Sequence, residues 1–299
     1  FVGVIIAGIT SIAAWIVLPE KLLALGLLAA TILTVLVGKQ DEKQPLRPAI
    51  QLIWQVSIAV VLVMFGWTIP YVTHPFQEGI LNLNWITIAT ISFPADLIAI
   101  IWIVLLMNVI NWIDGSDGLA SSISFVAFAA LATIALLPAI QNQTGFALAI
   151  IGLSATLAFF IWNAPPAKVY LGTTGSWFLG LFLALSSMYG GGKIATGALI
   201  LALPLLDAAY VLIRRLRDGQ LPWQGDTRNH IHHRLQQLGV SRWEIIVAAF
   251  IVTGWLALVS ILVATTIKLL LAGLLIAALG IGGLRLLIIH RRIERYEQQ

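Results

Sequence analysis

The stretch from residue 97 to residue 119 reads LIAIIWIVLLMNVINWIDGSDGL, an apolar run followed by amides, carboxylates and glycines. Residues 97–107 carry no charged, amide or hydroxyl side chain and can form part of a membrane-spanning helix. The polar cluster from Asn108 to Asp117 follows where such a helix would leave the hydrocarbon core. Helix capping explains one Asn, Asp or Gly at such a place. A whole cluster of polar residues at a membrane boundary is costly and predicts a functional site.

The composition predicts an all-α polytopic membrane protein, because 60% of the residues are hydrophobic and only 10% are charged. We expect residues 1–299 to form a single integral membrane domain, in which residues 1–18 are an internal membrane helix preceded by a further segment. The chain has no cysteine, which excludes disulfides and thiolate metal sites. Apolar segments of spanning length predict about ten transmembrane helices, at 1–18, 21–37, 49–69, 93–110, 120–138, 146–162, 175–189, 193–213, 244–266 and 268–289.

The distribution of basic residues predicts the orientation of these spans. If the loop at 38–48 is cytoplasmic, all of the 17 Lys and Arg residues except Lys21, Lys193 and Lys268 lie on the cytoplasmic side. This excess of positive charge should face anionic lipid headgroups and anionic substrates. Nucleic acid is not an expected partner, because aromatic and basic residues do not interleave on a soluble domain.

Residues 79–91 separate the third and fourth predicted spans. Polar residues interrupt the apolar ones there in a partly alternating way. This pattern predicts a short external β-hairpin or an amphipathic flap.

The predicted topology places four polar loops on the cytoplasmic side, at 38–48, 111–119, 163–176 and 214–242, where they can converge on one site. In the first loop the adjacent carboxylates Asp41 and Glu42 could bind a cation or supply a general base, or could belong to a solvated loop of mixed charge. The third loop leads through two prolines to a glycine-rich turn at a helix start. Backbone amides at this turn, together with Lys168, suit a phosphate, although a tight turn explains the glycines equally well.

The fourth loop contains His230, His232 and His233, with Arg228 and Arg234 on either side. Histidine and arginine side chains can together neutralise a diphosphate. A zinc site is a weaker alternative because no carboxylate partner lies at the usual spacing, and a solvated basic loop is another. Asp207, inside a predicted span, lies close to the cytoplasmic boundary and is expected to hydrogen-bond the loops beneath it.

Four sequence motifs together resemble the polyprenyl-phosphate N-acetylhexosamine-1-phosphate transferases. They are Gly38 to Lys43, the cluster from Asn108 to Leu119, the segment from Asn163 to Ser176, and His230-Ile-His232-His233. The His-Ile-His-His pattern is closest to the branch that primes polysaccharide and teichoic-acid synthesis. The resemblance implies transfer of a sugar phosphate from a UDP-N-acetylhexosamine to a polyprenyl phosphate, with release of UMP, at the cytoplasmic face of the bacterial plasma membrane.

The resemblance also implies roles for individual residues. Mg²⁺, with Mn²⁺ as an alternative, would be held by Asn111 and by the residue at position 173. Asp41, Glu42 and Asp114 would be catalytic, with Asp41 near the attacking phosphate. Asp117 would contact the uracil. The histidine loop would hold the diphosphate. The residues expected to bind substrate are Asn108, Asp117, Asn163, Lys168, Arg228, His230, His232 and His233. The expected partners are the nucleotide sugar, the polyprenyl phosphate and membrane lipid, with a homodimer left open.

The chain departs from the family pattern at the second metal position. Thr173 stands where the family has an aspartate, so the site loses one negative charge. Glu42 replaces the second aspartate of the first motif, which lengthens its side chain by one methylene. We therefore expect weakened metal binding and turnover, unless Glu42 or Asp114 replaces the lost carboxylate. A catalytically degenerate relative that binds the same ligands is the alternative, and a secondary transporter is disfavoured because no inverted repeat is evident.

Overall fold

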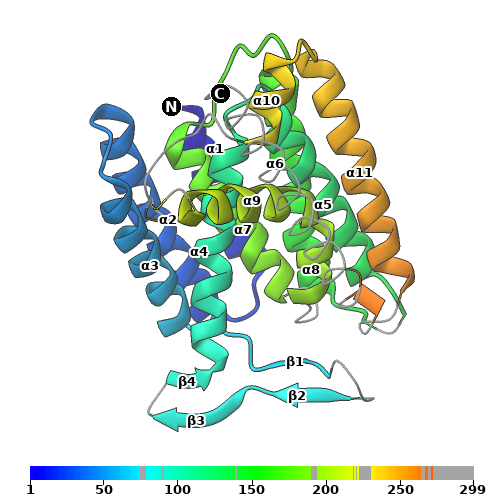
Figure 1. Cartoon of the computed structure of the whole chain (residues 1–299). Coiled ribbons are helices and arrows are strands. Elements are labelled where there is room, and N and C mark those ends of the chain that lie inside the picture. Colours follow the sequence, from blue (N-terminus) through cyan, green and yellow to red (C-terminus); the bar gives the residue numbers. More distant parts are fainter. Residues whose placement is uncertain are drawn as a thin grey trace.

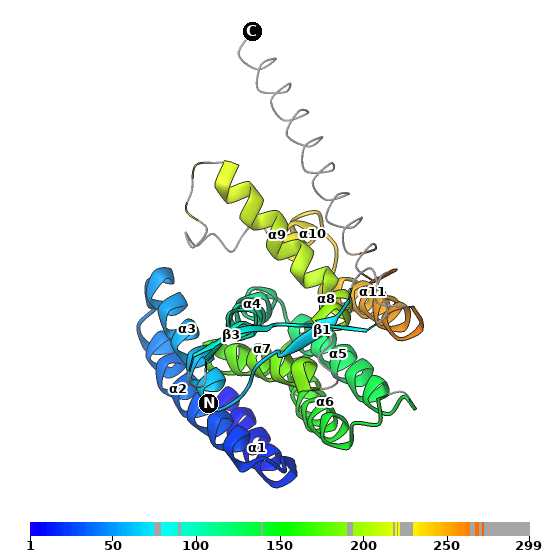
Figure 2. The ribbon, with the colours of Figure 1, turned by 90° about the horizontal axis from the view of Figure 1, so that it is seen from below.

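Helix α7 (Gly172–Tyr189) is the central helix of the bundle in the computed structural model of this chain. Its side chains from Thr174 to Met188 are all buried. Around it pack α1 (Val2–Val17), α2 (Lys21–Lys43), α4 (Ala95–Ile113), α5 (Leu119–Ala135) and α6 (Gln143–Asn163). Figure 2 shows α7 between α1 and α2 on one side and α5 and α6 on the other. The first turn of α7 is therefore held in the middle of one end of the bundle.

The structure describes residues 1–74, 79–88, 91–138, 140–189, 194–217, 219, 221, 230–263, 267–268 and 271. The remaining described helices are α3 (Pro48–Met64), α8 (Ile194–Ile200), α9 (Ala202–Arg217), α10 (Ile231–Gln237) and α11 (Arg242–Leu262). Local sequence signals mark several helix starts. Pro48 begins α3, the side chain of Asn142 accepts a hydrogen bond from the Gly145 amide before α6, and Ser241 and Glu244 form a capping box at α11.

The prediction of ten transmembrane spans is not confirmed. Among the described residues, four helices are long and apolar enough to cross a membrane, namely α2, α4, α6 and α11, and a fifth span results if α8 and α9 are counted as one. The apolar helices α1, α3 and α5 have 16 or 17 residues, which is short for a hydrocarbon core of about 30 Å. Nearly all of the predicted span at 268–289 lies outside the described residues.

The predicted span at 193–213 is not one straight helix. The chain bends by 82° between α8 and α9, and Figure 2 shows α9 projecting away from the bundle. Pro204 explains why a straight helix is disfavoured there. It has no N–H to donate to the carbonyl of Ile200, and its ring would clash with that carbonyl.

Four short strands connect α3 to α4. β3 (Asn84–Ile88) and β4 (Ile91–Pro94) are consecutive antiparallel strands, in agreement with the predicted hairpin. β2 (Ile80–Asn82), which we expected in the same hairpin, pairs instead with β1 (Tyr71–Thr73). The two small sheets lie at the end of the bundle opposite α10 (Figure 1).

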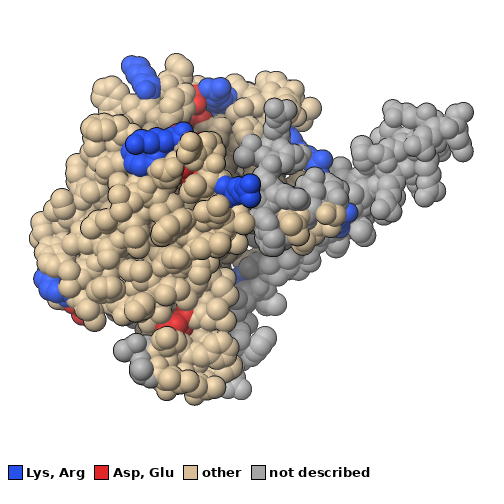
Figure 3. Space-filling view, turned by 90° about the vertical axis from the view of Figure 1, so that its left-hand side faces the viewer, with Lys and Arg blue, Asp and Glu red and all other residues tan. Residues whose placement is uncertain are grey.

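The outer surface of the bundle matches a membrane environment. Figure 3 shows the side of α2 and α3, where a wide uncharged band lies below a group of Lys and Arg side chains. Large apolar side chains of these helices, such as Leu36 and Ile53, are exposed. Such a surface is stable only when lipid covers it, since in water it would favour aggregation.

Candidate functional site

Four polar segments reach the same end of the bundle (Figure 1). They are the last turn of α2, the α4–α5 connection, the α6–α7 connection and α10. The helices extend further than expected, so Asp41 and Glu42 lie on α2, Asn111 on α4 and Thr173 on α7 instead of in loops. Regular helices hold these side chains more rigidly than loops would.

Asp41 is the centre of the first group of contacts. Its Oδ2 accepts a hydrogen bond from the Thr173 hydroxyl at 2.7 Å. Its Oδ1 accepts from the Leu46 amide at 2.9 Å and from Gln51 Nε2 at 2.8 Å. The buried carboxylate is thus surrounded by neutral donors that replace the lost water.

Close contact between α2 and α7 makes this arrangement possible. A Cβ at Gly38 would lie 2.6 Å from Thr174 Cα, so only glycine fits there. Glu42 accepts from the Thr174 amide at 3.2 Å through one oxygen and pairs with Lys39 at 2.6 Å through the other. The carboxylate of Glu42 therefore stabilises the amino-terminal end of α7, where backbone N–H groups are unpaired.

The oxygen atoms expected to bind Mg²⁺ are engaged in hydrogen bonds with neighbouring side chains. Oxygen ligands are the kind that Mg²⁺ prefers, but the Thr173 hydroxyl donates its proton to Asp41, and Asn111 Oδ1 accepts a 2.7 Å hydrogen bond from Ser176. Among the described residues, no group of three or more His, Asp or Glu side chains could hold a metal ion. A cation bound there would have to use the lone pairs that these hydrogen bonds leave free.

Asn108 lies on α4 about one helical turn before Asn111, further inside the bundle. Its Nδ2 donates to Gln55 Oε1 on α3 at 2.6 Å and to the Val104 carbonyl at 2.8 Å. Gln55 is buried, and its own Nε2 has no hydrogen-bond partner in the described structure. Asn108 thus joins α3 to α4, a role that sequence reasoning did not predict.

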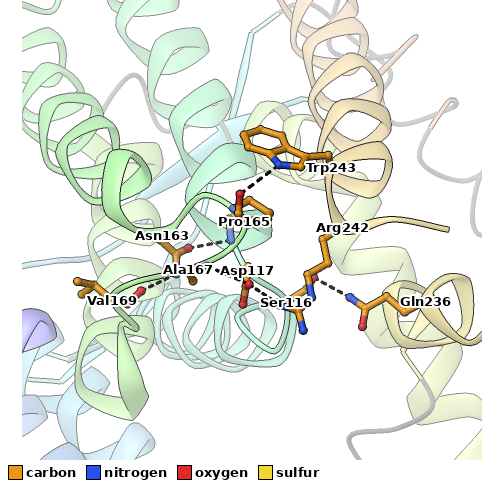
Figure 4. A network of polar contacts seen from close by, with 10 residues as sticks. Ser116, Asp117, Asn163, Pro165, Ala167, Val169, Gln236, Arg242 and Trp243 are labelled. Carbon is orange, nitrogen blue, oxygen red and sulfur yellow. Dashed lines mark hydrogen bonds and ion pairs between the residues drawn. The ribbon is translucent and has the colours of Figure 1, made fainter. Parts of the chain in front are cut away.

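Asp117 and Asn163 fasten the loops of the site together (Figure 4). Asp117 Oδ2 accepts from the Ala167 amide at 3.1 Å and forms a short ion pair with Arg242 at the start of α11. Asn163 accepts from the Gly118 amide at 2.9 Å and donates to the Val169 carbonyl at 2.9 Å. Each side chain therefore connects the α4–α5 loop to the α6–α7 loop.

Two further side-chain contacts complete this network (Figure 4). Gln236 of α10 donates to Ser116 at 2.9 Å, and the Trp243 indole donates to the Pro165 carbonyl at 3.1 Å. Both loops are thus anchored to α10 and α11.

The three histidines lie beside this network. A Cβ added to Gly115 would lie 3.4 Å from His232 Nε2 and 3.2 Å from His233 Nε2, so α10 is in contact with the α4–α5 loop. Burial lowers the pKa of His232 to about 4 and also lowers the pKa of His233, and the neighbouring imidazoles add to both effects. His232 is therefore neutral at pH 7 when no anion is bound.

Asp114 is the residue that follows the last turn of α4. Burial raises the pKa of this carboxyl from 3.8 to about 8. It is therefore mostly protonated near pH 7 and can donate a hydrogen bond or exchange a proton there.

The structure adds residues to the site and leaves one unplaced. Lys168 is exposed on the α6–α7 connection, and Arg228 lies outside the described residues. Sequence reasoning missed Gln51, Gln55 and Arg242. The two glutamines are four positions apart in an apolar segment, and this spacing places both on one helix face, a signal that could have revealed them.

Residues 24–191 match glycosyl transferase family 4. This segment is more than half of the chain and runs from the first turn of α2 to the end of α7, with Asp41, Asn111, Asp117 and Thr173. The chain belongs to glycosyl transferase family 4.

Similar proteins occur in several bacteria. The chain is 29% identical over 213 residues to a probable undecaprenyl-phosphate N-acetylglucosaminyl 1-phosphate transferase of Bacillus subtilis, with 69% of this chain and 56% of the relative covered. It is 32% identical over 104 residues to an undecaprenyl-phosphate alpha-N-acetylglucosaminyl 1-phosphate transferase of Thermotoga maritima, covering 34% of this chain and 33% of the relative. It is 27% identical over 137 residues to a decaprenyl-phosphate N-acetylglucosaminephosphotransferase of Mycobacterium leprae, covering 40% and 33%. The matches thus span about half or less of these relatives.

Proposed function

We propose that this family 4 chain transfers an N-acetylhexosamine 1-phosphate from a UDP-sugar to a polyprenyl phosphate, with release of UMP. One observation carries the proposal. The last turn of α2, which carries Asp41 and Glu42, the last turn of α4, which carries Asn111, and α10, which carries His232 and His233, lie at the same end of an apolar helical bundle (Figure 1). An anionic lipid and a water-soluble nucleotide can meet only where hydrocarbon ends and water begins. We place this end at the cytoplasmic face of the plasma membrane, and a homodimer remains a prediction.

The chemistry requires that two anions approach each other. A phosphate oxygen of the lipid attacks the sugar-bearing phosphorus, and the bond from that phosphorus to the bridging oxygen breaks, so that UMP leaves with this oxygen. Positioning and charge stabilisation account for most of the catalysis in such transfers. We assign the diphosphate to the histidines of α10 and Lys168, and assign Asp114 as a proton donor to substrate oxygens.

We further propose that Thr173 weakens metal binding and slows turnover in this copy. Mg²⁺ would supply positive charge to the phosphates in relatives that carry an aspartate at this position. Here the Thr173 hydroxyl donates to Asp41, so both residues are already satisfied without a cation. An aspartate at position 173 would instead place two carboxylates within contact distance and so create a demand for a cation.

Release of UMP tests both statements. The purified chain is supplied with undecaprenyl phosphate and UDP-GlcNAc or UDP-GalNAc, with and without Mg²⁺. We expect slow release from the wild-type chain and a rate in Thr173→Asp at least about 10-fold higher, dependent on Mg²⁺. Thr173→Val should stay slow, and Thr87→Asp, on an exposed strand at the other end of the bundle, should match wild type. Equal robust rates in wild type and Thr173→Asp would show that Thr173 does not impair the site.

A degenerate relative is the second candidate function, and the Thr173–Asp41 hydrogen bond favours it. Such a chain would bind the lipid phosphate or the nucleotide sugar without joining them, as an assembly or regulatory partner. If wild type and Thr173→Asp both bind UDP-GlcNAc but release no UMP, this second function replaces the first.

A further inference from the structure

Asp207 of α9 holds one of the three histidines through both of its carboxylate oxygens. Oδ2 lies 2.7 Å from His230 Nδ1, and Oδ1 accepts a hydrogen bond from the Ile231 amide at 2.8 Å. Asp207 and His230 are both buried. Because a carboxylate only accepts hydrogen bonds, the ring must carry a proton on Nδ1.

Among the described residues, no hydrogen-bond partner lies on the opposite side of the same ring. His230 Nε2 and His232 Nε2 are buried, and neither atom has a hydrogen-bond partner among the described residues. The two rings are nearly parallel, with centroids 5.8 Å apart. Buried polar atoms are normally paired, so two such nitrogens side by side indicate a ligand that is polar and accepts or donates at both.

The ring is also fixed from the side. Trp112, next to Asn111 on α4, lies 5.8 Å from His230, centroid to centroid. Arg215, eight residues after Asp207 on α9, lies over the Trp112 ring, with its Cζ 5.9 Å from the ring centroid. The bend between α8 and α9 brings α9 across the end of α4, so one helix supplies both the carboxylate and the arginine.

We propose that Asp207 is a positioning residue that fixes His230 with Nδ1 protonated and Nε2 directed to the substrate diphosphate. The proposal rests on the function given above for the histidines. A hydrogen bond between Nε2 and a diphosphate oxygen is then charge-assisted, because the carboxylate of Asp207 lies against the other nitrogen of the ring. A hydrogen bond from a charged donor is about twice as strong as one from a neutral donor.

The variant Asp207→Asn tests whether Asp207 positions the His230 ring, separately from any effect on folding. The asparagine has the same shape, and its oxygen still accepts from the Ile231 amide. Its NH₂ group must then face His230 Nδ1 and donate to it, which moves the ring proton to Nε2. An asparagine in place of an orienting aspartate produces this wrong tautomer in serine proteases. The ring would stay in place but lose its counter-charge.

The experiment uses the full chain in detergent with ¹⁵N-labelled histidine. The chain has five histidines, and His230→Gln assigns the His230 signal in nitrogen NMR. We expect a protonated Nδ1 and an unprotonated Nε2 in wild type, the reverse in Asp207→Asn, and roughly 10-fold weaker binding of UDP by the variant in calorimetry. Asp96→Asn is the matched control, because Asp96 is a buried aspartate that also accepts from a backbone amide, that of Ser92, near the sheets.

The possible results test the role of Asp207 separately from the identity of the donor substrate. A protonated Nε2 in wild type, or an unchanged tautomer and unchanged UDP affinity in Asp207→Asn, would overturn the role of Asp207. If the tautomers are as expected but wild type does not bind UDP, the positioning of the ring stands and the proposed donor substrate is wrong. A loss of UDP affinity in Asp96→Asn equal to that in Asp207→Asn would assign the effect to folding and also overturn the proposal.

Discussion

At the scale of single residues, hydrogen bonds from neutral donors stabilise the carboxylate of Asp41. Three neutral donors, from Thr173, Gln51 and the Leu46 amide, surround a carboxylate that stands beside Glu42. A metal ion could serve the same purpose, but it would bring charge and could exchange with solvent. The residue type at position 173 thus decides whether Asp41 meets a hydrogen-bond donor or a second carboxylate there.

Asp114 allows a prediction for the effect of pH on stability. Burial raises its pKa from 3.8 to about 8, so between these values the folded chain keeps a proton that the unfolded chain releases. Stability from this residue is therefore complete below the lower value and is lost as pH rises through the upper one.

The variant that tests this is Asp114→Asn, which cannot ionise. Between about pH 6 and about pH 8.5 we expect the thermal unfolding midpoint of wild type to fall more steeply than that of the variant. Differential scanning calorimetry in matched detergent measures both. Parallel curves would mean that Asp114 ionises normally in the folded protein.

At the scale of elements, the position of α7 explains the packing of the bundle. This helix is buried on all sides, and Gly180 lets it approach α4 closely. A Cβ at Gly180 would lie 2.4 Å from the Leu106 carbonyl oxygen. Small residues at helix contacts are the usual means of close packing in membranes.

Gly180→Val should therefore destabilise the bundle by about 1 to 3 kcal/mol through overpacking. Gly8→Val on α1 is the matched control, because a Cβ at Gly8 would meet no atom within 4 Å. Unfolding in a denaturing detergent series measures the difference. A similar loss of stability in both variants would show that the effect comes from β-branching in a helix and not from the contact with α4.

At the scale of the whole molecule, contacts across the chain close the loops of the site. The ion pair of Asp117 with Arg242 connects the α4–α5 loop to α11, 125 positions later in the sequence. Trp243 ties the same helix to the α6–α7 connection. The site is thus assembled only when α11, the last described helix, packs against the loops that follow α4 and α6.

Arg242→Gln should loosen this closure. We expect hydrogen exchange in residues 164–171 to become roughly 10-fold faster, which corresponds to a loss of about 1.4 kcal/mol. Mass spectrometry of the exchanged protein measures it. Arg47→Gln, before α3, is the control, since it removes an arginine of the same end of the bundle outside this network. Exchange that is as slow in Arg242→Gln as in wild type would contradict the role of the ion pair.

Local patterns in the sequence were enough to predict a helical membrane bundle, strands between residues 79 and 91, and hydrogen bonds of Asp207 to the neighbouring polar loops. Hydrophobic runs and caps act over a few residues, so they can be recognised without knowledge of the fold. The bend between α8 and α9, the central place of α7 and the roles of Gln51, Gln55 and Arg242 depend on which surfaces meet. Contacts between residues far apart in the chain decide these features, since close packing and the pairing of buried polar groups arise only when the whole bundle is assembled.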